Sequence, residues 1–191
     1  MSKSKLIIGA GVTTLAAIAF PVATFAASGT SVTDTVQVTI NSACSITADS
    51  LTPAYSATMT NGQLKSNFGS TSMSIACNDA GGWHLTAVGS GADTTVKTAM
   101  NASGSGTDIA TGTATSGATS NWAMKVAGTG AVTAFTSFAA VPSSATDVAN
   151  GTGSVSGNTV STTYQVWVSA TQQADTYTGK VTYTLAHPAS T

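Results

Sequence analysis

Charged residues are scarce in this chain, and their scarcity removes whole classes of partner. Lysine, arginine, aspartate and glutamate make up 7% of the residues, and arginine and glutamate do not occur at all. Ordinary globular domains carry roughly 25% charged residues. Nucleic-acid binding needs clustered basic side chains that replace phosphate counterions. The lysines beyond residue 26 are widely separated, so we exclude a nucleic-acid partner.

Catalytic and metal-binding patterns are also missing. His84 and His187 are the only histidines, and the two cysteines do not form a Cys-x-x-Cys motif. The seven aspartates stand singly, without the close spacing that calcium loops use. We therefore expect no enzyme, no metal and no cofactor. A secreted hydrolase is a remote alternative, and it would depend on His84.

Long hydrophobic runs are absent except at the start of the chain. Residues 1–26 have the features of a secretory signal: Lys3 and Lys5, an apolar stretch over residues 6–20, and the small-residue cleavage site Thr24-Phe25-Ala26. A membrane anchor is the alternative, but glycines, threonines and a proline dilute the apolar stretch. We predict cleavage before Ala27, a secreted protein without a transmembrane anchor, and one domain over residues 27–191.

What the chain does contain is apolar residues at every second position, typical of strands with one buried face. The pattern predicts strands at residues 35–40, 44–48, 72–77, 83–88, 121–127, 163–170 and 176–185. Residues 89–120 and 143–161 are rich in Gly, Ser and Thr and are predicted to be long loops. The fold class that follows is all-β, an immunoglobulin-like antiparallel sandwich of about seven strands.

Cys44 and Cys77 are an even pair in an exported chain, which favours a disulfide. Both fall on the inward faces of their predicted strands. By the same alternation Trp83 and Trp122 face the core. Trp167 is out of phase with its apolar neighbours and is the best candidate for an exposed aromatic contact.

Two segments, Trp83-His84-Leu85 and the stretch from Tyr177 to Pro188, resemble the signature motifs of WxL-type bacterial cell-surface domains, with Tyr183 at the place of the second Trp. The resemblance implies a non-enzymatic protein of the bacterial cell surface that binds peptidoglycan or another envelope component non-covalently. The wall-binding residues that it implies are Trp83, Leu85, Tyr177, Val181, Thr182, Tyr183, Leu185 and Pro188.

A second resemblance leads to an alternative function. Residues 36–46, Ile75-Ala76-Cys77 and residues 179–183 are similar to spore-coat-U and chaperone-usher pilin domains. That resemblance implies self-association, in which an N-terminal extension adds a strand to the next subunit. Residues 32–40 could be such a donor, or the first strand of a self-contained sandwich, which is the simpler interpretation.

Overall fold

The computed structural model describes residues 37–48, 55–89 and 98–188. The predicted signal at residues 1–26 lies outside these ranges. The chain divides into two units, Met1–Thr39 and Ile40–Thr191, and every strand belongs to the second. No helix in the described ranges is long and apolar enough to span a bilayer.

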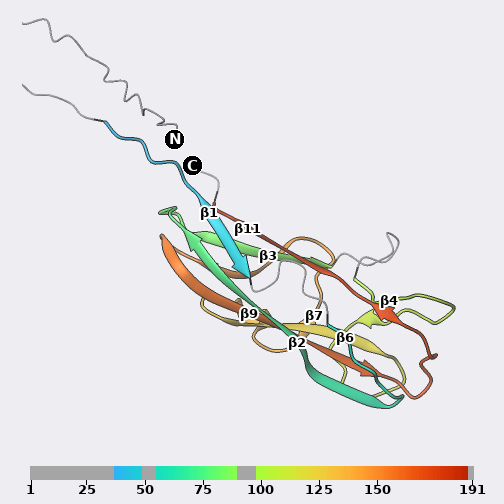
Figure 1. Ribbon diagram of the computed structural model, residues 1–191. Coiled ribbons are helices and arrows are strands. Elements are labelled where there is room, and N and C mark those ends of the chain that lie inside the picture. The colour runs from blue at the N-terminus through green and yellow to red at the C-terminus, as the bar shows by residue number, and fades with distance from the viewer. Residues whose placement is uncertain (1–36, 49–54, 90–97, 189–191) are drawn as a thin grey trace, which may run out of the picture. The chain divides into compact units, whose positions relative to one another are not determined.

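The larger sheet has the strand order β1-β2-β9-β6-β5, and β7 also pairs with β6 (Figure 1). All of its pairings are antiparallel except that of β5 with β6. Its strands are β1 (Cys44–Ala48), β2 (Gln63–Cys77), β9 (Val155–Val168), β6 (Asn121–Gly128), β5 (Ala110–Thr111) and β7 (Ala139–Ala140).

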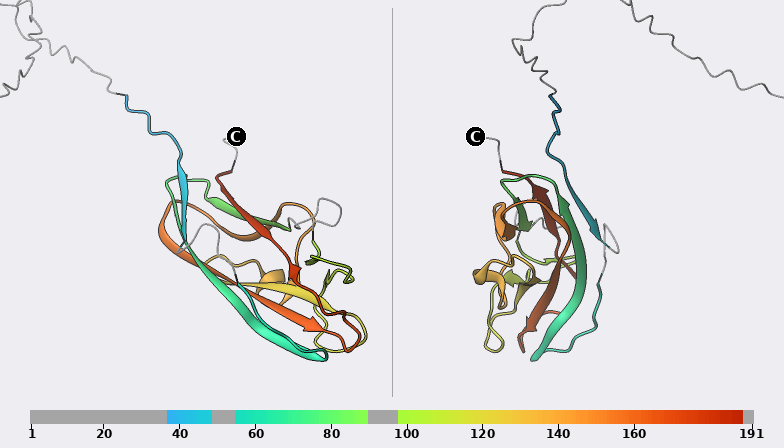
Figure 2. Two further views of the ribbon diagram at one scale, coloured as in Figure 1. Left: turned by 45° about the vertical axis from the view of Figure 1, so that its right-hand side comes forward. Right: turned by 90° about the vertical axis from the view of Figure 1, so that its left-hand side faces the viewer.

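The smaller sheet has the order β11-β3-β8, again antiparallel, and lies across the core from the larger one (Figure 2). Its strands are β11 (Val181–Ala186), β3 (Trp83–Gly89) and β8 (Thr146–Gly151). Two short strands, β4 (Asn101–Ala102) and β10 (Tyr177–Thr178), pair separately, and a 3-10 turn, η1, covers Thr133–Phe135. The predicted all-β sandwich is confirmed.

The core forms where the inward faces of the two sheets meet. Alternate residues of β3 are buried. The facing sheet contributes buried apolar residues from β2 and β9: Met73, Ile75, Cys77, Val160, Val166 and Val168. Trp83 is fully buried and Trp122 is 4% exposed, so the predicted core positions of both are confirmed. Burying a large side chain stabilises the fold by about 1.5 to 3 kcal/mol.

The predicted disulfide between Cys44 and Cys77 is also confirmed. The two residues are direct partners in the pairing of β1 with β2. A sequence separation of 33 residues corresponds to a stabilisation of about 3 to 4 kcal/mol in the chain-entropy model. The bond therefore attaches β1 firmly to the larger sheet.

The prediction of a loop over residues 143–161 is wrong. That stretch forms β8 and the first half of β9. Its few apolar residues, such as Val148 and Val160, are buried, but Ser, Thr, Asn and Gly fill the remaining positions and hide the period of two. Pairing with β3 and β2 supplies the hydrogen bonds that make these residues strands.

The structure differs from the prediction at the first and the last predicted strands. In the first, the part that the structure describes, residues 37–40, forms no strand, and β1 begins only at Cys44. The last is interrupted at Gly179-Lys180, where the chain passes from β10 to β11. A Cβ atom on Gly179 would lie 2.9 Å from the Trp122 ring, so only glycine fits at this crossing.

Candidate functional site

The two segments that resemble WxL motifs lie side by side, because all of β11 pairs with residues 84–89 of β3. Leu85 is directly opposite Leu185, and Ala87 is opposite Tyr183. The structure thus brings most of the predicted wall-binding residues into one pair of strands. Tyr177 is separate, because β10 pairs with β4 instead.

These predicted residues differ sharply in exposure. Trp83 and Leu85 are fully buried, and a Cβ atom on Gly151 would lie 2.6 Å from the indole nitrogen of Trp83. Thr182 is exposed. The remaining predicted residues are partly buried: Tyr177, Val181, Tyr183, Leu185 and Pro188. The accessible part of the set is therefore β11 and its flanks.

Trp167 lies on the outer face of the larger sheet, opposite Leu64 of β2. Its ring is partly buried, and its indole N–H donates to the carbonyl of Gly117 at 3.3 Å. Leu64 is 39% exposed.

Among the residues that the structure describes, the outer edge of β11 is open. Within the described residues, no strand pairs with that edge, although the other edge is fully paired with β3. Constant-type immunoglobulin sandwiches have the strands A, B, E and D in one sheet and C, F and G in the other. Here β1-β2-β9-β6 follows the order A-B-E-D, and β3-β11 follows C-F. The position of G, beside β11, has no strand from the described residues.

Apolar side chains border this edge. Val181, Tyr183 and Leu185 of β11 are only partly buried, although they contact the core. β1, the edge strand of the facing sheet, approaches β11, and Cys44 and Ile46 are likewise partly buried against the core (Figure 1). An unpaired strand edge presents free N–H and C=O groups, and apolar side chains beside it favour pairing with a further strand.

A pair of tyrosines lies beneath the open edge. The hydroxyls of Tyr164 and Tyr183 are 3.0 Å apart, and the Tyr55 ring lies 6.3 Å from the ring of Tyr164. Burial raises the pKa of both Tyr164 and Tyr183, and for Tyr183 the nearby Tyr164 adds to the effect. Both hydroxyls therefore keep their protons at neutral pH, so the site carries no charge there.

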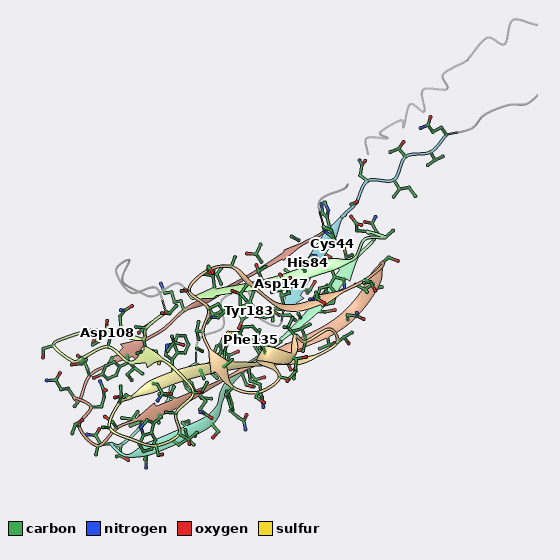
Figure 3. The ribbon with its side chains drawn as sticks, turned by 180° about the vertical axis from the view of Figure 1, so that it is seen from behind. Cys44, His84, Asp108, Phe135, Asp147 and Tyr183 are labelled. Atoms are coloured by element: carbon green, nitrogen blue, oxygen red, sulfur yellow. A yellow bond between two sulfur atoms is a disulfide. The ribbon has the colours of Figure 1, made fainter. Side chains whose placement is uncertain are left out.

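The residues before β1 are held at one end of the sandwich. The Asn78 side chain accepts from the Ala43 N–H at 2.6 Å and donates to the Asn41 carbonyl at 3.1 Å. Beside it, Asp79 lies 3.4 Å from the imidazole of His187. Hydrogen bonds from the Gly81 N–H and the Ser42 hydroxyl, with a smaller contribution from His187, lower the pKa of Asp79. We call this the Cys44 end, and Asp108 lies toward the opposite end (Figure 3).

His84 forms a second acid–imidazole pair on the outer face of the smaller sheet. Its Nδ1 lies 2.9 Å from Asp147 Oδ2, and the side chains are 41% and 43% exposed (Figure 3). In a catalytic triad the second imidazole nitrogen would meet a nucleophile. Among the described side chains, no serine, threonine or cysteine hydrogen bonds to His84, and no three potential metal ligands cluster.

The open edge could not be predicted from the sequence, because the residue pattern of a single strand does not indicate how many strands lie beside it. A second feature accompanies the open edge: Ile40, which belongs to the alternating apolar run before β1, is 81% exposed. In comparisons with known proteins, the chain matches no protein-family model, no curated protein and no solved structure.

Proposed function

We propose that this chain is a structural subunit of a fibre on the outside of a bacterial cell, and that it assembles by strand addition. Residues 32–40 of one copy would pair with the open edge of β11 in another copy and complete the smaller sheet. The observation that carries the proposal is the edge of β11 that no strand of the described residues pairs with, together with the partly buried Val181, Tyr183 and Leu185.

The N-terminal extension has the composition that such an edge needs. Val32, Val36, Val38 and Ile40 recur at even positions, and Thr or Gln fills most of the odd ones. Val38 and Ile40 are 79% and 81% exposed. Apolar side chains that are exposed next to one another, and not scattered singly, mark interaction surfaces in soluble proteins. Burying two of them would stabilise the assembly by about 1.5 to 3 kcal/mol each.

The size of the purified mature protein tests the proposal. We expect wild-type protein to form polymers in size-exclusion chromatography with light scattering, and fibres in electron micrographs. Val38→Asp places a charge on the face that would be buried and should leave a folded monomer. Gln37→Asp adds the same charge on the opposite face and should still polymerise.

Circular dichroism of the two variants provides the folding control. Both should retain the β-sheet spectrum of the wild type, because residues 37–40 form no strand in the subunit. A wild-type protein that remains monomeric at every concentration would refute the proposed function, as would equal polymerisation of the two variants.

Association with peptidoglycan is a second proposal, and it depends on the resemblance of the β3 and β11 segments to WxL motifs. Burial of Trp83 and Leu85 leaves β11 as the accessible part of those segments. Co-sedimentation of the mature protein with purified peptidoglycan tests it. If Val38→Asp monomers sediment as well as the wild type, wall binding is independent of assembly.

A further inference from the structure

A small cavity lies at the end of the sandwich away from the Cys44 end. Its volume is about 190 Å³, below the roughly 300 to 1,000 Å³ of sites for drug-sized ligands. Asp108 is one of its lining residues (Figure 3). Three segments that are far apart in the sequence form its walls: residues 107–108, 118–120 and 169–173. Loops gathered at one end of a sandwich are a common place for a binding site.

Hydrogen bonds join the three walls, so the cavity is formed before any ligand enters. The Ser120 hydroxyl accepts from the Ser169 N–H at 2.9 Å. The Gln172 side chain donates to the Thr107 carbonyl at 2.6 Å and to the Tyr177 hydroxyl at 2.8 Å. A site that is already ordered loses less conformational entropy when it binds.

Other polar groups of the walls are left for a ligand. The hydroxyls of Thr107 and Thr119 and the amide of Gln173 have no hydrogen bond to any described residue, and all three residues are exposed. The Asp108 carboxylate accepts one hydrogen bond on each oxygen, from residues 101–102. A carboxylate has about four acceptor sites, so two of them remain.

The charge of the cavity excludes several classes of ligand. Asp108 is the one charged residue among those that line it, so a phosphate or carboxylate ligand would meet no cation. Calcium takes roughly six to eight oxygen ligands, and no three potential metal ligands cluster in the part of the chain that the structure describes. An apolar ligand would bury hydroxyls and amides without partners, which is costly. A small neutral molecule with several hydroxyl groups remains.

We infer that this cavity binds one ring of a neutral saccharide, and that Trp167 stacks against the next ring. A hydroxyl both donates and accepts hydrogen bonds, and so does an amide, whereas a carboxylate accepts only. The free groups of Thr107, Thr119, Gln173 and Asp108 therefore match the hydroxyls around a sugar ring. None of the cavity residues belongs to β11 or to residues 32–40, so the inference does not depend on the proposed assembly.

Trp167 lies next to the cavity along two segments of the chain. It precedes the wall residue Ser169 by two residues, about 7 Å at roughly 3.4 Å per residue. Its indole N–H donates to the carbonyl of Gly117, the residue before the wall residue Ala118. The ring is partly exposed. An aromatic ring offers an apolar face with a polar edge, which suits the C–H groups on one side of a sugar.

Saturation-transfer NMR on the sugar tests the inference with the wild-type mature chain, whether it is a monomer or a fibre. The probes are glucose, galactose, mannose and N-acetylglucosamine, with glucuronic acid as the charged counterpart. We expect transfer to at least one neutral sugar, and less to glucuronic acid. No transfer to any neutral sugar would overturn the inference, as would stronger transfer to glucuronic acid.

Two substitutions in the walls locate the bound sugar. Gln173→Ala and Thr107→Val each remove one free polar group and should weaken the affinity about two- to tenfold, the effect of one lost hydrogen bond. Thr159→Val is the matched control, because Thr159 is exposed in β9 and does not line the cavity. All three variants should keep the circular dichroism spectrum of the wild type. Equal affinity in the wall variants and the control would overturn the inference.

Trp167 is tested with the disaccharide of the sugar that binds. Trp167→Ala should weaken binding of the disaccharide about two- to tenfold and leave binding of the single sugar unchanged. Trp167→Phe keeps a ring but loses the hydrogen bond to Gly117, so it should bind the disaccharide almost as well as the wild type. Equal losses for the single sugar and the disaccharide would overturn the stacking and show that Trp167 only positions the wall.

Discussion

β3 and β11 are neighbours in one sheet and share the same alternation of inward and outward residues, but they differ in how many strands flank them. β3 pairs with β11 and β8, and its inward residues are fully buried. β11 pairs only with β3 among the described residues, and its inward residues stay partly exposed. Leu85 and Leu185 are the same residue type and lie directly opposite each other, so the neighbours of each strand, and not its sequence, set the burial.

The largest expected effect comes from truncating these two opposed leucines. Leu85→Ala should lower the free energy of unfolding by about 2 to 5 kcal/mol, because it leaves a cavity in the core. Leu185→Ala should cost less in the monomeric Val38→Asp background, about 1 to 2 kcal/mol, since part of its side chain is already in water. Urea denaturation measures both, and equal losses would mean that the edge of β11 is covered in the monomer.

A smaller effect is expected from the tyrosine pair under the open edge. Tyr183→Phe removes the hydrogen bond to Tyr164 and should destabilise the subunit by about 0.5 to 1.5 kcal/mol.

The same pair predicts a pH dependence. Because burial raises the pKa of both tyrosines in the folded state, their contribution to stability is complete below the unfolded value near 10 and is lost as pH rises above it. Denaturation midpoints between pH 8 and 11 measure this loss. A Tyr183→Phe variant as sensitive to alkali as the wild type would contradict the assignment.

The smallest effect lies away from both strands, where Asp175 holds a loop. Its carboxylate accepts hydrogen bonds from the Ser103 hydroxyl and from the N–H groups of Gly104, Gly106 and Thr176. These bonds, with that of Ser103 the largest contribution, lower the pKa of Asp175 to about 2.

A lowered pKa gives stability that is present above the unfolded value and is lost as pH falls from about 4 to about 2. We expect faster amide hydrogen exchange at Gly104 and Gly106 over that range, and in Asp175→Asn already at neutral pH. Protection at β3 should not change. Unaltered exchange of the two glycine amides in the variant would show that Asp175 does not hold the loop.

The sequence pattern predicted the central strands better than the edges. Trp83, Leu85 and Ala87 alternate with polar residues on a strand that has one buried face, so the period of two is clear and the core positions were correct. β8 and the first half of β9 were missed because Ser, Thr and Gly are tolerated on their exposed faces. Their strand character comes from the partners with which they pair.

The candidate site also has one part that could be predicted from the sequence and one that could not. The alternating extension and the residues of β11 could be identified along the chain, and the two resemblances drew attention to both. The open edge could not be predicted, because it depends on the absence of a neighbour beside β11 among the described residues. Residues 35–40 have the pattern of a strand, but that pattern does not indicate which sheet, or which copy of the chain, supplies the partner.

The amino-acid sequence by itself determined the class of fold, the pair of cysteines that join, and the faces of the central strands, because alternation and residue chemistry act locally. Only the tertiary structure decided which strands are central and which are edges, since hydrogen bonding between strands joins residues that are far apart in the chain. The proposed role depends on that second level: the same apolar alternation is core in β3 and, in the part of the chain that the structure describes, an open edge in β11.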